Sequence, residues 1–327
     1  MSAATGANSL LQLDGAAEVD RICSTMLGQV RDVLKRRGVV LGLSGGIDSS
    51  VCAALAVRAF GADRVIGLFM PEADSSPDSL ELGRRIAEWL GIRSFLENIT
   101  PVLDGAGCYR RRDEAIRSVV PGYGDGYKSK IVLPPPGSAY NIFSLVVQAP
   151  DGTVTKSRLT SDAYLAIVAA TNFKQRVRKM IEYYYADRFN FAVIGTPNLL
   201  EYDQGFFVKN GDGAADVKPI AHLYKSQVYQ LAAVLGVPED IRRRPPTTDT
   251  YSLPQSQEEF YFTLPYDKMD LCLYGLNHQM PAKEIAAIAG LDEAQVVHAY
   301  KDIQTKRSTT RYLHERPLLV ETVESVS

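Results

Sequence analysis

The 327-residue sequence has few cysteines, few histidines and no long apolar run. Its four cysteines are far apart and its four histidines show no zinc-ligand spacing, so we expect reduced thiols rather than disulfides or a zinc site. Lys and Arg number 36 against 38 Asp and Glu, and this net charge of −2 gives no attraction to nucleic acid or anionic lipid. No stretch approaches about 20 uninterrupted apolar residues, and the N-terminus has no basic segment leading into one. We therefore expect a cytoplasmic globular protein with neither nucleic acid nor membrane as a partner.

Short apolar runs alternate with helical periodicities along most of the chain. The runs indicate buried strands over 39–43, 65–70, 92–96 and 190–195. The periodicities predict helices over 15–38, 51–60, 79–90, 161–188 and 225–235. Repeated strand–loop–helix units predict an α/β fold, a doubly wound parallel sheet with helices on both faces and right-handed crossovers.

The alternation breaks between residues 105 and 160, where we expect a small β insertion. A charged helix is predicted over 109–120, extended chain over 130–133 and 140–147, and a strand over 154–159 after the hairpin signal Asp151-Gly152. The predicted division is an N-terminal helix (1–38), a main domain (39–275) carrying the insertion, and a helical extension (276–327) packed on that domain. The extension's helices, over 283–289 and 292–306, have a helix-turn-helix cadence. An apolar helix pair more often packs on its own domain than binds DNA.

The segment S-G-G-I-D-S-S over 44–50 joins a predicted buried strand to a predicted helix. Its two glycines let backbone N–H groups approach a phosphate closely, and the helix N-terminus adds partial positive charge. Asp48 would repel a bare phosphate, which indicates a bridging Mg²⁺. No lysine follows the glycines, so the segment is not a Walker A loop. A plain tight turn is the alternative, but the full pattern in this context favours pyrophosphate binding.

This segment resembles the pyrophosphate loop of the N-type ATP pyrophosphatases, and residues downstream of it resemble the NAD synthetase family in particular. The further motifs that carry the resemblance are N-F-K-Q-R-V-R (172–178), Gly195-Thr196 with Glu201, G-F-F-V-K-N-G-D-G-A-A-D (205–216), Lys225-Ser226-Gln227 and Pro246-Thr247. They stand in the family's order and spacing. The resemblance covers most of 39 to about 275, less the insertion, and implies an adenine nucleotide alpha-hydrolase-like fold.

The resemblance implies an ATP-dependent, amide-forming ligase. ATP would adenylate the carboxylate of deamido-NAD (nicotinic acid adenine dinucleotide) with release of pyrophosphate, and ammonia would then displace AMP to give NAD. The residues that it implies for ATP are Leu43, Ser44, Gly45, Gly46, Ile47, Asp48, Ser49, Ser50, Thr196, Lys225 and Thr247. Those for deamido-NAD are Asn172, Arg176, Lys209, Asp212, Asp216 and Lys225. Asp48, Thr196, Lys225 and Thr247 would act at the reacting centre, and Asp48 and Glu201 would hold Mg²⁺.

The chain departs from the family pattern in two places. Residues 197–200 are Pro-Asn-Leu-Leu rather than the His-Ala-Ala of ammonia-dependent enzymes, and M-P-E-A-D-S-S over 70–76 looks closer to the glutamine-dependent branch. No glutaminase domain is expected before residue 39, so ammonia would come from solution or from a separate glutaminase subunit. The insertion matches neither branch. The resemblance further implies a homodimer, with the 161–188 helix and the N-terminal helix as contacts.

Several alternatives stay open at this point. The enzyme could be a related amide ligase that adenylates a different carboxylate, or the chain could be a non-catalytic nucleotide-binding module. Taken without the family's register, Glu201 could be a surface carboxylate, and Asp212 and Asp216 could be turn residues among glycines. Arg176 and Arg178 could lie on a solvated helix face.

Overall fold

A four-stranded parallel sheet forms the centre of the computed structural model, which describes residues 10–133, 143–245 and 250–323. Its strands are β1 (Val39–Gly42), β2 (Val65–Phe69), β3 (Arg93–Leu96) and β7 (Ala192–Val193), in the order β3-β2-β1-β7. β1 and β2 are buried along almost their whole length, as expected for inner strands of a parallel sheet. β7 is shorter than predicted, and from Val193 onward the chain also bonds to residues 216–217.

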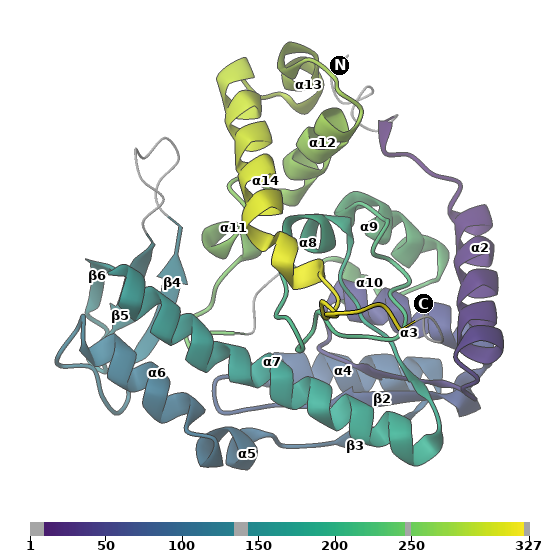
Figure 1. Cartoon of the computed structure of the whole chain (residues 1–327), viewed down its shortest axis with the longest axis horizontal. Coiled ribbons are helices and arrows are strands. Elements are labelled where there is room, and N and C mark those ends of the chain that lie inside the picture. The colour runs from purple at the N-terminus through teal and green to yellow at the C-terminus, as the bar shows by residue number, and fades with distance from the viewer. Residues whose placement is uncertain (1–9, 134–142, 246–249, 324–327) are drawn as a thin grey trace.

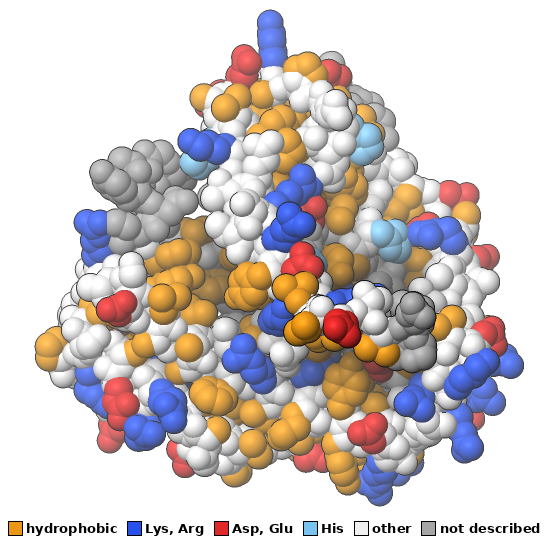
Figure 2. Space-filling view, viewed as in Figure 1, with side chains coloured by type: hydrophobic (Ala, Val, Ile, Leu, Met, Phe, Trp, Pro, Cys, Tyr) orange, Lys and Arg blue, Asp and Glu red, His pale blue; other side chains and the backbone are white. Residues whose placement is uncertain are grey.

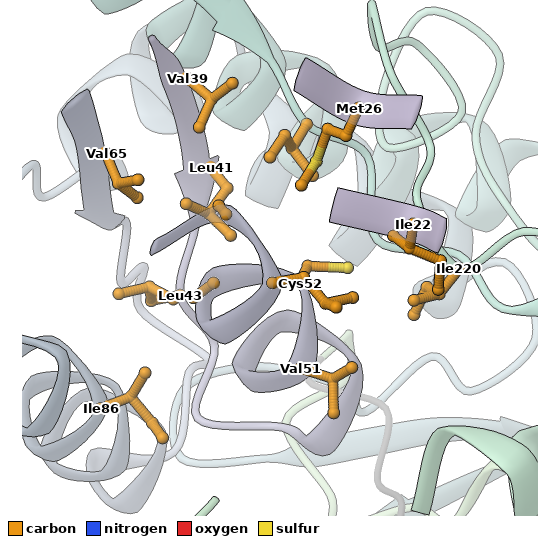
Figure 3. Packing of buried hydrophobic residues seen from close by; sticks show 14 of the residues in the cluster. Ile22, Met26, Val39, Leu41, Leu43, Val51, Cys52, Val65, Ile86 and Ile220 are labelled. Atoms are coloured by element: carbon orange, nitrogen blue, oxygen red, sulfur yellow. The ribbon is translucent and has the colours of Figure 1, made fainter. Parts of the chain in front are cut away.

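Helices cover both faces of this sheet, which confirms the doubly wound prediction (Figure 1). Alternate residues of β1 point to opposite faces: Val39 and Leu41 join one core cluster and Val40 joins another. The first cluster is packed by α2 (Gly15–Gly28), α3 (Ile47–Phe60), α4 (Pro77–Leu90) and α9 (Lys225–Val234). Figure 3 shows its side chains between β1, α2 and α3. The second is packed by α5 (Thr100–Gly105), the start of α6 (Cys108–Arg117) and α7 (Ser161–Phe189).

The first helix ends ten residues earlier than its periodicity predicts. After α2, residues Gln29–Val33 form the π-helical turn η1, in which the N–H of Leu34 donates to the carbonyl oxygen of Gln29. Lys35 then adopts a left-handed conformation with φ of 55°, which an ordinary helix cannot contain. A short 3₁₀ turn, η2 (Ala62–Arg64), similarly leads into β2.

The predicted β insertion is present as an antiparallel sheet of three strands, β4 (Lys128–Val132), β5 (Ser144–Gln148) and β6 (Val154–Arg158). The expected hairpin joins β5 to β6, with Gly152 at a φ of 87°. Residues 140–142, predicted to be extended, lie outside the described residues. α6 packs along the first half of α7, so the insertion sits against one end of that long helix (Figure 1).

The C-terminal helices form a cluster of their own beside the sheet. They are α12 (Tyr266–Asn277), α13 (Ala282–Ala289) and α14 (Glu293–His314). The helix pair with the DNA-binding cadence buries Ile285, Val296 and Ile303 in this cluster. Helices that the sequence analysis did not predict are α5, α8 (Leu199–Gln204), α10 (Glu239–Arg242), α11 (Gln257–Phe260) and α12. Among the described residues, no helix has the length and apolar character needed to cross a membrane.

Candidate active site

The loop between β1 and α3 leaves the N-terminus of α3 open. Gly46 is the N-cap and offers no side chain to the first N–H groups of the helix. Gly45 has a φ of 72°, and a Cβ there would lie 2.6 Å from the Cβ of Leu82, so this position excludes a side chain. The hydroxyls of Ser49 and Ser50 donate to the carbonyl oxygen of Gly46, at 3.0 and 2.8 Å. The result is a compact turn with outward backbone N–H groups, a suitable seat for phosphate.

Asp48, in the first turn of α3, forms an ion pair with Lys225 at the start of α9. The other oxygen of Asp48 accepts a hydrogen bond from the Asn198 side chain at 3.1 Å. Lys225 is only 2% exposed, and although burial acts to lower its pKa, the charges of Asp48 and Glu201 outweigh this and raise it. Lys225 therefore holds a fixed positive charge beside the open end of α3.

The backbone at Lys225 is held by a buried carboxylate from the C-terminal helices. Asp270 of α12 is fully buried, and its oxygens accept from the backbone N–H groups of Lys225 and Ser226 at 3.1 and 2.7 Å and from the Ser226 hydroxyl at 2.5 Å. Burial raises the pKa of Asp270 to about 6 despite these bonds. Asp270 thus satisfies the N-terminus of α9 and sets the position from which Lys225 reaches Asp48.

Glu201 lies next to Asp48 and belongs to a capping box at the start of α8. Its N–H donates to the Asn198 side chain at 3.3 Å, and its carboxylate accepts from the backbone N–H of Asn198 and from Gln257, at 3.2 and 2.9 Å. Burial and the nearby charge of Asp48 raise the pKa of Glu201 to about 7. Two neighbouring, partly buried carboxylates are oxygen donors of the kind that suits Mg²⁺.

These residues line a cavity of about 600 Å³ that continues toward α7 and α14. The implied residues that line it are Leu43, Ser44, Gly46, Ile47, Asp48, Ser49, Asn172, Arg176, Thr196, Glu201, Lys209, Asp212 and Lys225. The structure therefore brings together most of the residues that the sequence analysis selected, from segments up to 182 positions apart (225 − 43). Such an assembly is typical of a binding site at the carboxyl ends of parallel strands.

Among the described residues, two implied ATP residues and one implied deamido-NAD residue do not line this cavity. Gly45 faces α4 and Ser50 is fully buried, so both shape the loop from behind. The Asp216 carboxylate accepts from the backbone N–H of Val193 at 2.8 Å and from the Tyr183 hydroxyl at 3.2 Å, which fixes the end of β7. Thr247 lies outside the described residues.

The sequence analysis did not select the C-terminal part of the cavity wall. Thr310, Tyr312 and Leu313 of α14 line it, and the amine of Lys209 donates to the carbonyl oxygens of Tyr312 and Glu315, at 2.6 and 3.0 Å. Figure 2 shows apolar side chains gathered around this end of α14. No local motif marks these residues. In contrast, the spacing of Asn198 and Glu201 was a detectable capping signal for α8.

A parallel α/β sheet with an open helix N-terminus, a buried lysine and two carboxylates at one cavity defines a nucleotide-binding protein of the adenine nucleotide alpha-hydrolase-like class. A sequence model described as NAD synthase matches residues 18–115 and 144–312, and the chain belongs to this family. The match omits residues 116–143, which lie inside the segment expected to be an insertion.

Curated relatives agree with the family assignment. An "NH(3)-dependent NAD(+) synthetase" of Rhizobium meliloti (strain 1021) is 64% identical over 318 residues, which cover 97% of this chain and 95% of the relative. A protein of the same name from Thermotoga maritima is 38% identical over 241 residues, 73% of this chain and 80% of the relative. Both relatives are ammonia-dependent by name, although residues 197–200 here lack His-Ala-Ala.

Solved structures resemble the chain in fold. The "NMN synthetase from Francisella tularensis" matches with a TM-score of 0.65 at 22% identity, covering 95% of this chain and all of the other. The "NH3-dependent NAD synthetase from Campylobacter jejuni" matches with a TM-score of 0.63, also at 22% identity and with the same coverage. They confirm the fold class that the sequence predicts.

Proposed function

We propose that the chain is an ammonia-dependent NAD⁺ synthetase that adenylates deamido-NAD with ATP and then amidates it. The observation that carries this proposal is the cavity in which the open N-terminus of α3 meets Asp48, Lys225 and Glu201, in a chain 64% identical to ammonia-dependent synthetases. Such a cavity provides what a pyrophosphate leaving group needs, namely backbone N–H donors and a fixed cation.

In the first step, a carboxylate oxygen of deamido-NAD forms a bond to the α-phosphorus of ATP while the bond from that phosphorus to the pyrophosphate breaks. Negative charge then grows on the pyrophosphate, whose oxygens would accept hydrogen bonds from the backbone N–H groups at Gly46 and the start of α3. The ammonium of Lys225, held by Asp48, would stabilise charge on the transferring phosphate. In the second step, ammonia attacks the acyl carbon, AMP leaves, and the nitrogen loses a proton.

The Asp48 and Glu201 carboxylates are the proposed Mg²⁺ ligands. Burial and the nearby charge of Asp48 raise the pKa of Glu201, and a divalent cation held by these carboxylates would offset the repulsion between them. When bound, Mg²⁺ would neutralise charge on the phosphate oxygens of ATP. The side-chain amide of Asn198 donates to Asp48, and its backbone N–H donates to the Glu201 carboxylate. Asn198 would therefore orient both ligands.

At the far end of the cavity, the proposed dinucleotide residues come from two segments. Asn172 and Arg176 lie on α7, and Lys209 and Asp212 lie on the loop after α8. Arg176 donates to the carbonyl oxygen of Lys209 at 3.3 Å, so the two segments are in contact. Asp216 would act indirectly, through the position of this loop.

We propose a cytoplasmic homodimer with α7 in the interface. The four cysteines are buried free thiols, as in a reducing compartment. Leu165, Met180 and Tyr184 of α7 are 61%, 54% and 54% exposed, which is unusual for large apolar side chains on one helix of a monomer.

The test combines the protein with ATP, MgCl₂, NH₄Cl and deamido-NAD and measures NAD, AMP and pyrophosphate. We expect equimolar products, and pyrophosphate–ATP exchange that requires deamido-NAD but not ammonia. The alternative is a related amide ligase for another carboxylate, with ammonia delivered by a separate glutaminase. Nicotinate mononucleotide is the competing acid to include, given the name of one structural neighbour. Pyrophosphate release with that acid and not with deamido-NAD would exclude our proposal.

A further inference from the structure

A second buried lysine, Lys174 on α7, lies at the centre of an ion cluster outside the cavity. Its ammonium is 3.0 Å from an oxygen of Glu72, 2.7 Å from Asp74 and 2.9 Å from the carbonyl oxygen of Thr250. Lys174 is 1% exposed, and the side chain of Glu72 is fully buried. Lys174, Glu72 and Asp74 do not line the cavity, so the mechanism above does not use them.

The cluster joins two segments that wall the nucleotide end of the cavity. Glu72 and Asp74 belong to the loop after β2, in which Pro71, Ser75 and Ser76 line the cavity. Thr250, which also lines it, begins the described chain again just after residues 246–249, the segment that contains Thr247. The ammonium of Lys174 thus connects both wall segments to α7 from outside the cavity.

Helix α6 contributes to the same cluster. Arg112 donates to Asp74 at 2.5 Å and to Asp113 at 2.8 Å, and the Tyr109 hydroxyl donates to Glu72 at 2.9 Å. Burial acts to raise the pKa of Asp74, but the charges of Lys174 and Arg112 outweigh it and lower that pKa. With two cations facing it, Asp74 stays ionised, and the loop after β2 is tied to both α6 and α7.

We propose that the Lys174–Asp74–Arg112 cluster is a positioning device that makes α6 part of the active site's support: it fixes the 71–76 loop and Thr250 against bound ATP. None of its members is a catalytic residue, because none faces the cavity. Without Arg112, Asp74 would lose one of its two cations, and the loop that carries Pro71, Ser75 and Ser76 would loosen. The proposal rests on the proposed function only in that ATP is the ligand of the cavity.

The experiment compares Arg112→Ala with Arg110→Ala on the same helix, where Arg110 forms an exposed pair with Glu114. We measure the Kd for ATP with MgCl₂ by calorimetry, KM and kcat for synthesis, and Tm. Arg112→Ala should raise the Kd and KM for ATP by about 10-fold or more, because a misplaced wall costs binding. Arg110→Ala should change them less than about 2-fold. A folded Arg112→Ala protein with unchanged ATP binding would overturn the proposal.

Two further variants keep the test decisive if Arg112→Ala fails to fold. Arg112→Lys retains the charge and should bind ATP more weakly than the wild type but more strongly than Asp74→Asn, which weakens both ion pairs. Equal ATP binding in the wild type and in these two variants would also overturn the proposal. Failure of the proposed function looks different: the wild-type protein would bind ATP and make no NAD, or would bind no ATP at all.

Discussion

Lys225 and Lys174 are two buried lysines, each paired with an aspartate, yet they have different surroundings. Lys225 and its partners Asp48 and Glu201 line the cavity, so a ligand can compete for its charge. Lys174 meets two carboxylates and a carbonyl oxygen behind the cavity wall, where a ligand has no access to it. The comparison teaches that burial and pairing do not distinguish an active-site lysine from a structural one. What distinguishes the two lysines is whether a ligand in the cavity can reach the ammonium group.

The largest expected effect is on activity, from Asp48→Asn. We expect synthesis to fall by about 10³-fold or more, because Lys225 loses its counter-charge and the proposed Mg²⁺ site loses a ligand. Steady-state NAD formation measures this. Asp63→Asn, at an exposed position after the same helix, is the matched control and should retain full activity. An active Asp48→Asn protein would remove the metal assignment.

The difference between the two lysines is tested most directly by changing each to methionine. Lys174→Met leaves Glu72 and Asp74 buried without their central cation and should lower the free energy of unfolding by about 3–5 kcal/mol. Lys225→Met should lower kcat by about 10²-fold and have a smaller effect on Tm, because Asp48 keeps its bond from Asn198 and access to solvent. Urea unfolding and kcat are measured on both. If the two variants behave alike, access to the cavity does not separate their roles.

The pH dependence of stability tests the carboxylate side of the site. Glu201 has a folded pKa of about 7, above its ordinary 4.5, so the folded state holds a proton that the unfolded state releases. The free energy of unfolding should therefore decrease as pH rises from about 4.5 to 7, by roughly 1–3 kcal/mol. Urea titrations without Mg²⁺ at pH 5 to 8 measure the slope, which Glu201→Gln should flatten. An unchanged slope in that variant would place the titration elsewhere.

A smaller effect is expected at Asp270, which positions Lys225 through the backbone. Asp270→Asn removes a charged acceptor from two N–H groups and should cost about 2 kcal/mol of stability. It should also lower kcat severalfold, more than it changes the KM for deamido-NAD. Asp267→Asn, exposed on the same helix, should alter stability by less than about 0.5 kcal/mol. Equal behaviour of the two variants would show that α12 does not influence Lys225.

The sequence predicts best what is built locally. The strand, loop and first turn of α3 span only residues 39–50, and apolar patterning with glycine and serine spacing predicts that unit directly. The hairpin at Asp151-Gly152 is equally local and is confirmed. The short helices α8, α10 and α11 are four to six residues long, too short for a helical period to register.

Contacts across long stretches of chain could not be predicted. Lys225 and Asp48 are 177 residues apart, and Lys174 and Asp74 are 100 apart. Periodicity carries no information about such pairs, and only the family resemblance pointed to Asp48, Glu201 and Lys225 together. The resemblance also selected Asp216, whose side chain fixes β7 instead of lining the cavity. Helix α12 was not predicted because it is buried on most sides and has no clear polar face.

The cavity is lined by residues from Gly42 to Leu313, so nearly the entire length of the polypeptide contributes to it. A nascent chain on the ribosome would hold the phosphate loop and its sheet long before α14 emerges. The cavity wall would be complete only after the segment up to Leu313 had emerged, and fragments that end before residue 310 would lack the part of the wall that α14 provides.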